Sequence, residues 1–246
     1  MNEYEQRALA EVKDWKRKLQ KRSSILNRVS KKAQNKINSY LPEKMHQAIT
    51  EAIKQMIQGT LAGGNWIKKK NPPIFHSLQG KDEELTKKIN QYQKAAVVEG
   101  AGTGAGGLLL GLADFPLLLS IKMKFLMEAA ATYGYDTEQL EERIYLLYIF
   151  QLAFSSEEKR REILEIVENW EDEKKKIASL NWRGLQQEYR DFIDFVKMLQ
   201  LVPGIGAAVG AYANYNLMEQ LGEAARNVYR MRYFQEQEQI KEGNGF

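Results

Sequence analysis

Few residues of this chain have the type and spacing that catalysis needs. The only two histidines, His46 and His76, lie far apart in the sequence, and there is no cysteine. A thiol nucleophile, a thiolate metal site and a multi-histidine zinc site are therefore excluded. The Gly-x-Ser-x-Gly elbow of serine hydrolases is also missing. We predict that the protein binds no metal or other cofactor and is not a catalyst.

Two carboxylates, Asp114 and Glu99, could still act as an acid or a base. Asp114 is the only charged residue in the glycine-rich stretch 100–121. A buried carboxylate is costly unless it accepts several hydrogen bonds. We predict that Asp114 caps the helix whose first turn contains Pro116, or bonds across to Asn214. The alternative is a hydrolase or lipid-modifying enzyme with Asp114 or Glu99 in a cavity between glycine-rich hairpins.

The run from Gly102 to Gly107 matches the dinucleotide pattern Gly-x-Gly-x-x-Gly, but its context does not. The preceding residues read as the end of a helix, no βα alternation occurs elsewhere, and no Gly-Lys-Ser/Thr follows. We therefore predict that the small residues allow close helix packing. The predicted glycine and polar core comprises Gly102, Gly104, Gly106, Asp114, Pro116, Pro203, Gly204, Gly206 and Asn214.

Positive charge is concentrated near the N-terminus. Residues 13–36 hold ten lysines and arginines against one acid, Asp14, so this segment carries more charge than the whole chain, whose net charge is +4. A basic helix with an aromatic residue suits an anionic membrane surface. The alternative is a solvated helix whose apolar side packs on the core. Nucleic acid is disfavoured, because no recognition-helix motif occurs and the rest of the chain is slightly acidic. The predicted surface-binding residues are Lys13, Trp15, Lys16, Arg17, Lys18, Lys21 and Arg22.

The elements that carry these candidate residues are predicted to be helices. Apolar side chains recur at spacings of three and four, and β-type alternation is nearly absent. A content of 43% hydrophobic and 28% charged residues is typical of a folded protein. Gly134 is placed to end one helix, and Asp136 with Gln139 resembles a capping box for the next. The predicted helices span 3–40 as one or two helices, 42–58, 81–99, a stretch ending near 133, 137–154, 157–175, 182–200 and a C-terminal helix.

Two stretches, 100–121 and 198–218, are long enough to span a bilayer and nearly free of charge. Their hydropathy is low for a spanning helix, and Asp114, Pro116 and Pro203 would interrupt them. We predict a buried pair of helical hairpins, with reversibly inserting hairpins as the alternative. The polar, acidic N-terminus lacks the pattern of a secretory signal, so we expect a cytoplasmic protein.

Several motifs resemble those of the EcsC family. They are Gly100 to Gly107, Ala113 to Leu118, Tyr133-Gly134-Tyr135-Asp136 with Glu142-Arg143, Val202 to Gly206, Gly210, Asn214 and Gly222 to Ala225. The resemblance covers roughly residues 45–234. It implies a bacterial, Gram-positive protein, and, since the family is named for a protein encoded beside an ABC transporter, a link to transport or secretion. It implies no reaction, cofactor or catalytic residue.

We therefore predict an all-α, single multi-helix domain with two central Gly-rich helical hairpins and a basic N-terminal arm. The predicted boundaries are 1–41 for the arm, 42–234 for the helical domain and 235–246 for a polar tail. The predicted function is a non-catalytic peripheral membrane or membrane-protein accessory factor, on the inner face of the plasma membrane. Its partner would be an anionic membrane surface or a membrane protein. Besides the enzyme named above, the alternative is a soluble protein-interaction scaffold.

Overall fold

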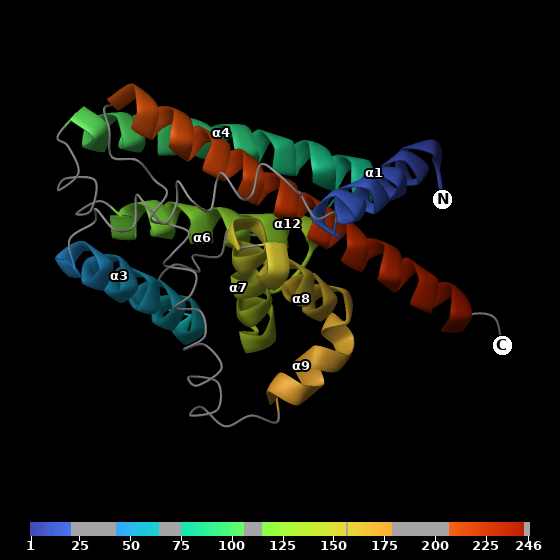
Figure 1. Ribbon diagram of the computed structural model, residues 1–246. Coiled ribbons are helices and arrows are strands. Elements are labelled where there is room, and N and C mark those ends of the chain that lie inside the picture. Colours follow the sequence, from blue (N-terminus) through green and yellow to red (C-terminus); the bar gives the residue numbers. More distant parts are fainter. Residues whose placement is uncertain (21–42, 64–74, 106–114, 156, 179–206, 244–246) are drawn as a thin grey trace.

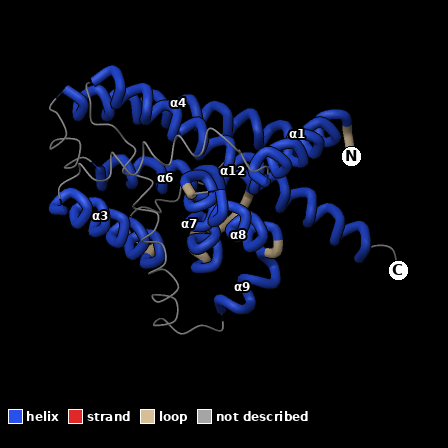
Figure 2. Tube along the Cα trace, viewed as in Figure 1, coloured by secondary structure: helices blue, strands red, loops and turns tan. Residues whose placement is uncertain are grey.

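The computed structural model describes residues 1–20, 43–63, 75–105, 115–155, 157–178 and 207–243. Helices joined by short turns and loops make up these ranges, which contain no strand (Figures 1 and 2). The all-α prediction is thereby confirmed. The helices are α1 (Glu3–Gln20), α3 (Glu43–Ala62), α4 (Leu78–Ala105), α6 (Phe115–Tyr133), α7 (Leu140–Phe154), α8 (Glu157–Glu168), α9 (Trp170–Ala178) and α12 (Ala207–Gly243).

The two longest helices, α4 and α12, lie side by side and antiparallel (Figure 1). Arg230 of α12 contacts Asp82 near the start of α4, whereas Gly222 faces Ile89 further along it. A Cβ atom on Gly222 would lie 2.7 Å from the Cγ1 and Cδ1 atoms of Ile89. The missing side chain of Gly222 therefore permits the close approach of these helices.

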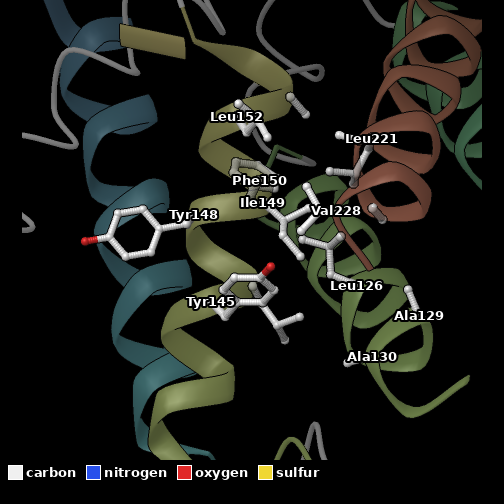
Figure 3. Packing of buried hydrophobic residues seen from close by; sticks show 14 of the residues in the cluster. Leu126, Ala129, Ala130, Tyr145, Tyr148, Ile149, Phe150, Leu152, Leu221 and Val228 are labelled. Carbon is white, nitrogen blue, oxygen red and sulfur yellow. The ribbon is translucent and has the colours of Figure 1, made fainter. Parts of the chain in front are cut away.

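Helices α6 and α7 fill the centre of the molecule. Every residue of α7 from Ile144 to Phe154 is buried, as expected for a helix that is apolar on all sides. Figure 3 shows Leu126 of α6, Ile149 of α7 and Val228 of α12 pointing toward one another. All three belong to one continuous apolar core, which also includes the buried faces of α1, α3, α4 and α8.

The end of α6 has the predicted glycine cap. Gly134 has φ +98°, a conformation that glycine adopts without strain. Its N–H donates to the carbonyl of Ala131 at 3.1 Å, and the N–H of Tyr135 donates to that of Ala130 at 3.0 Å. These two bonds define a Schellman motif. The chain reverses here and enters α7.

The predicted capping box at the start of α7 is wrong. The helix begins at Leu140, and its N-cap residue, Gln139, makes no side-chain cap bond. Asp136 instead accepts a hydrogen bond from the backbone N–H of Glu138 at 2.9 Å. Its carboxylate therefore closes a short turn before the helix, because local side-chain bonds of aspartate compete with helix formation.

One predicted helix, 157–175, is two helices in the structure. Asn169 separates α8 from α9, and its side chain donates to the carbonyl of Glu165 at 2.9 Å. Trp170 then turns inward and packs on Tyr145 and Tyr148 of α7, with ring centroids 4.8 and 6.0 Å apart. Burial of this indole favours the break over a continuous, solvated helix.

The glycine-rich stretches are described only in part. The backbone of α4 continues to Ala105, α6 begins at Phe115, and α12 begins at Ala207. Helix α4 packs against both α6 and α12. The rest of these stretches, 106–114 and 198–206, lies outside the described residues, so the predicted hairpins cannot be followed through it. Residues 21–40 and the predicted helix 182–200 also lie outside the described residues.

Candidate functional site

The basic segment is described as far as Gln20, where it forms α1. Ala8, Val12 and Trp15 lie on one side of this helix and are buried. That side packs against α12, α8 and α4. Trp15 is only 6% exposed, so its indole belongs to the core in this structure and is not at the surface where a bilayer would meet it.

The cations of α1 differ in their surroundings. Lys13, Arg17 and Lys18 are exposed, and Arg17 pairs with Asp14 one turn away. Lys16 forms an ion pair with Glu168 of α8 at 2.6 Å. Of the predicted surface-binding residues on α1, Lys13, Arg17 and Lys18 are therefore the exposed cations. The other two predicted residues, Lys21 and Arg22, lie outside the described residues.

Most of the predicted glycine and polar core also lies outside the described residues, and what can be placed is backbone. Gly102 and Gly104 belong to α4, Asn214 belongs to α12, and Pro116 is an exposed residue in the first turn of α6. Of Asn214, as of Glu99 in α4, the side chain is not described. The remaining five residues, Gly106, Asp114, Pro203, Gly204 and Gly206, are not described at all.

A cluster of buried charges and tyrosines, which the sequence did not predict, joins α4, α6, α7 and α12. In its first half, the buried carboxylate of Asp82 accepts hydrogen bonds from Arg230 Nε at 2.9 Å and from Tyr4 Oη at 2.8 Å. It also accepts a bond from the hydroxyl of Tyr133. Arg230 reaches on to Glu11 of α1, with Nη1 2.6 Å from Oε2.

The second half of the cluster centres on Glu142 of α7. Its carboxylate accepts hydrogen bonds from Arg232 Nη1 at 2.5 Å and from Tyr229 Oη at 2.9 Å. The Arg232 guanidinium also lies over the ring of Tyr135, 3.8 Å from its centroid. Tyr229 stacks between Tyr133 and Tyr135, with centroid distances of 5.2 and 5.3 Å. The stack links the two halves into one polar–aromatic cluster.

Burial sets the titration of this cluster. It raises the pKa of Tyr133 and Tyr229, and the neighbouring carboxylates raise it further, so both phenols remain hydrogen-bond donors. Burial also raises the pKa of Glu142, while Arg232 and Tyr229 oppose that shift. Lys81, which donates to the carbonyl of Tyr133 at 2.8 Å, has a pKa lowered by burial.

This arrangement joins helices rather than exposing reactive groups. Asp82 and Glu142 are each bonded to an arginine and to tyrosine, which occupies the oxygens that an acid or a base would use. Among the described residues, no group of three or more histidine or carboxylate side chains could hold a metal ion. His76 is exposed, and the His46 side chain is outside the described part. We assign the cluster a structural role.

Part of the cluster could have been found in the sequence. Tyr133, Gly134, Tyr135 and Glu142 lie in motifs that carry the family resemblance, and the structure brings them together around one Schellman turn. Asp82 had no such signal, because its partner Arg230 is 148 residues away in the chain.

The fold and the cluster define an all-α protein whose central helices are tied by buried arginine–carboxylate pairs. The family model of the EcsC protein family matches residues 6–234, so the chain belongs to the EcsC family. It is 50% identical to protein EcsC of Bacillus subtilis (strain 168) over 93% of this chain and 95% of that protein. It is also 27% identical to the uncharacterized protein YdbA of the same strain, over 91% and 90% of the two chains. No solved structure matches.

Proposed function

We propose that this protein is a non-catalytic peripheral membrane protein, or an accessory factor of a membrane protein, that acts on the cytoplasmic face of the plasma membrane. The observation that carries the proposal is the cation excess of residues 13–36, ten lysines and arginines against one acid. Each such cation near an anionic bilayer contributes about 1 kcal/mol. A link to transport or secretion is part of the proposal, through the gene neighbourhood for which the family is named.

The side chains that α1 exposes favour an electrostatic contact in this proposal. Trp15 is buried, which leaves the exposed Lys13, Arg17 and Lys18 as the described members of the predicted set that can face phosphate head groups. In the described ranges, no helix is both long and apolar enough to cross a membrane. We expect binding that depends on anionic lipid and weakens as salt screens the charges.

Liposome flotation of the full chain tests this proposal. We expect binding to vesicles with phosphatidylglycerol and little binding to vesicles of phosphatidylcholine alone. The variant Lys13→Glu, Arg17→Glu, Lys18→Glu removes three cations, so its affinity should fall about 100-fold or more. Lys16 is left intact because it pairs with Glu168.

A matched variant controls for net charge. Lys87, Lys124 and Lys175 are exposed lysines on α4, α6 and α9, and their replacement by glutamate changes the total charge equally. We expect this variant to bind anionic vesicles nearly as well as the wild type. Equal binding to neutral vesicles, or an equal loss in both triple variants, would contradict the proposal.

A further inference from the structure

Helix α1 has an acidic half and a basic half. The acidic half, residues 3–11, holds three glutamates against one cation. The basic half, residues 12–20, holds four cations against one acid, Asp14. An anionic bilayer attracts the basic half and repels the acidic half. The two halves therefore suit different neighbours, although one continuous helix carries both.

The acidic half is bound to the bundle through its first turn. Tyr4 Oη donates to the carboxylate of Asp82 of α4 at 2.8 Å. The carboxylate of Glu5 accepts a hydrogen bond from Tyr233 Oη of α12 at 2.9 Å. Both hydrogen bonds are partly shielded from solvent. The start of α1 is thus fixed to two helices at once.

The basic half is held by weaker polar contacts. In the described part of the chain, its ion pair with another helix joins Lys16 Nζ to Glu168 of α8 at 2.6 Å, and the two side chains are 33% and 24% exposed. An ion pair that is partly open to solvent adds little to stability. The same applies to Glu11, the last residue of the acidic half, which pairs with Arg230 and is 64% exposed. The basic half is therefore held mainly by its apolar side.

That apolar side has the pattern of a helix that lies in a membrane interface. At about 100° per residue, Val12, Trp15 and Leu19 form one stripe along α1. Lys16 lies beside this stripe on one edge, and Lys18 lies beside it on the other. Cations at both edges of an apolar stripe reach head groups while the stripe itself enters the acyl region.

The bundle and a bilayer offer this stripe apolar surroundings of the same kind. Val12 and Trp15 are buried where α1 packs on α12, α8 and α4. Figure 1 shows α1 at the periphery of the molecule, beside the start of α4. Movement of the stripe into a bilayer exchanges one hydrocarbon environment for another, while Lys16 and Lys18 gain phosphate neighbours. A bilayer that binds the released helix more tightly than the docked helix shifts the equilibrium toward release.

We propose that α1 is a latch: at an anionic lipid bilayer it swings away from α8 about its first turn, and Val12, Trp15 and Leu19 enter the acyl region. This inference rests on the membrane contact proposed above and adds its regulation, because the docked helix covers the apolar part of that contact. The acidic half stays at the bundle, where Tyr4 and Glu5 hold it away from head groups of like charge.

Quenching of tryptophan fluorescence by brominated acyl chains tests the latch, because the indole must enter the bilayer to be quenched. The chain has four tryptophans, so comparison of the wild type with Trp15→Phe isolates Trp15. With vesicles of brominated phosphatidylglycerol, we expect stronger quenching in the wild type than in Trp15→Phe. Equal quenching, with flotation of the wild type intact, would overturn the latch and leave the surface contact standing. No flotation of the wild type would overturn both proposals.

A cleavable crosslink between α1 and α8 provides a control within one molecule. Since the chain has no cysteine, the double variant Lys16→Cys, Glu168→Cys contains two thiols only. A bis-maleimide with a disulfide in its linker joins α1 to α8 where these two side chains meet. The crosslinked protein should show no more quenching than Trp15→Phe, and cleavage of the linker by a reductant should restore the signal. Quenching that does not change on cleavage would overturn the proposal.

A charge reversal on α8 tests the docking contact itself. In Glu168→Lys, repulsion of Lys16 replaces the ion pair and favours release of α1. Glu165→Lys, at an exposed position one turn earlier on α8, changes the total charge equally. Glu168→Lys should reach half of its maximal quenching at about threefold less lipid, or lower, than Glu165→Lys. An equal lipid requirement in the two variants would show that the Lys16–Glu168 contact does not hold the latch.

Discussion

Replacement of Asp82 by asparagine gives a sharp test of the polar–aromatic cluster. The substitution keeps the size of the side chain and removes its charge. In the wild type, this buried carboxylate accepts bonds from Tyr4, Tyr133 and Arg230. Without the charge, Arg230 remains buried, and its other acid, Glu11, is 64% exposed. A buried cation that loses its partner typically costs about 3–5 kcal/mol.

We expect the loss of stability to lie at the lower end of that range, about 3 kcal/mol, because Glu11 stays within reach of Arg230. For a chain of this size the melting temperature should fall by about 6–12 °C. Urea denaturation at neutral pH measures the free energy of unfolding, and an unchanged slope with urea would show that the denatured state is unaffected.

Glu11→Gln is the matched control, because it removes the second carboxylate of the same arginine. Its exposed position predicts a loss below about 1 kcal/mol. The double variant Asp82→Leu, Arg230→Met should recover most of the stability that Asp82→Asn loses, since an apolar pair leaves no unpaired charge. If Asp82→Asn costs no more than Glu11→Gln, the assignment of Asp82 as the buried anchor of Arg230 is incorrect.

Three further predictions concern the packing of the core and the charge within it. Trp15→Ala should lower the free energy of unfolding by about 3–5 kcal/mol, because the indole is buried; a loss near zero in urea denaturation would place it at the surface. Gly222→Leu should lower the free energy of unfolding by at least about 1–3 kcal/mol, because the new side chain would overlap Ile89. Gly59→Ala should raise it by up to about 1 kcal/mol, because no atom lies within 4 Å of the added carbon. Thermal melts compare the two variants with the wild type. Burial lowers the pKa of Lys122 in the folded state from 10.5 to about 8. The free energy of unfolding of the wild type should therefore rise by about 3 kcal/mol relative to that of Lys122→Met as the pH rises through that interval. A constant difference between the two proteins in urea denaturation would refute the burial of a charged amine.

The sequence predicted the helices well where one periodicity governed a segment. Ala8, Val12 and Trp15 recur as the face of α1 that the structure buries. The same spacing could not say whether that face would meet the core or a bilayer, because both are apolar. Only the contacts of α1 with α12, α8 and α4 show that Trp15 lies in the core. These helices are distant from α1 in sequence.

The buried charges were harder to predict. Asp82 lies within the acidic and basic run Lys81 to Glu84, where nothing in the sequence distinguishes the buried residue from its less buried neighbours. Lys122 did carry a readable signal, because it lies one turn from both Leu118 and Leu126 in an otherwise apolar stripe. Helix α8 ends before Asn169, and Trp170 packs against Tyr145 of α7. This is a tertiary contact, which the local pattern of charges cannot predict.

The two arginine–carboxylate pairs fix the position of α12 more than they add to net stability. Arg230 and Arg232 lie two residues apart on α12, yet they pair with carboxylates of different helices, Asp82 of α4 and Glu142 of α7. Sliding α12 by one turn would move both guanidinium groups by about 5.4 Å and leave both buried carboxylates unpaired. Apolar pairs of similar size can be as stable as a buried ion pair, but they carry no charge that a shifted register would leave unpaired. The charges therefore penalise wrong registers, which is the structural role that we assign to the cluster.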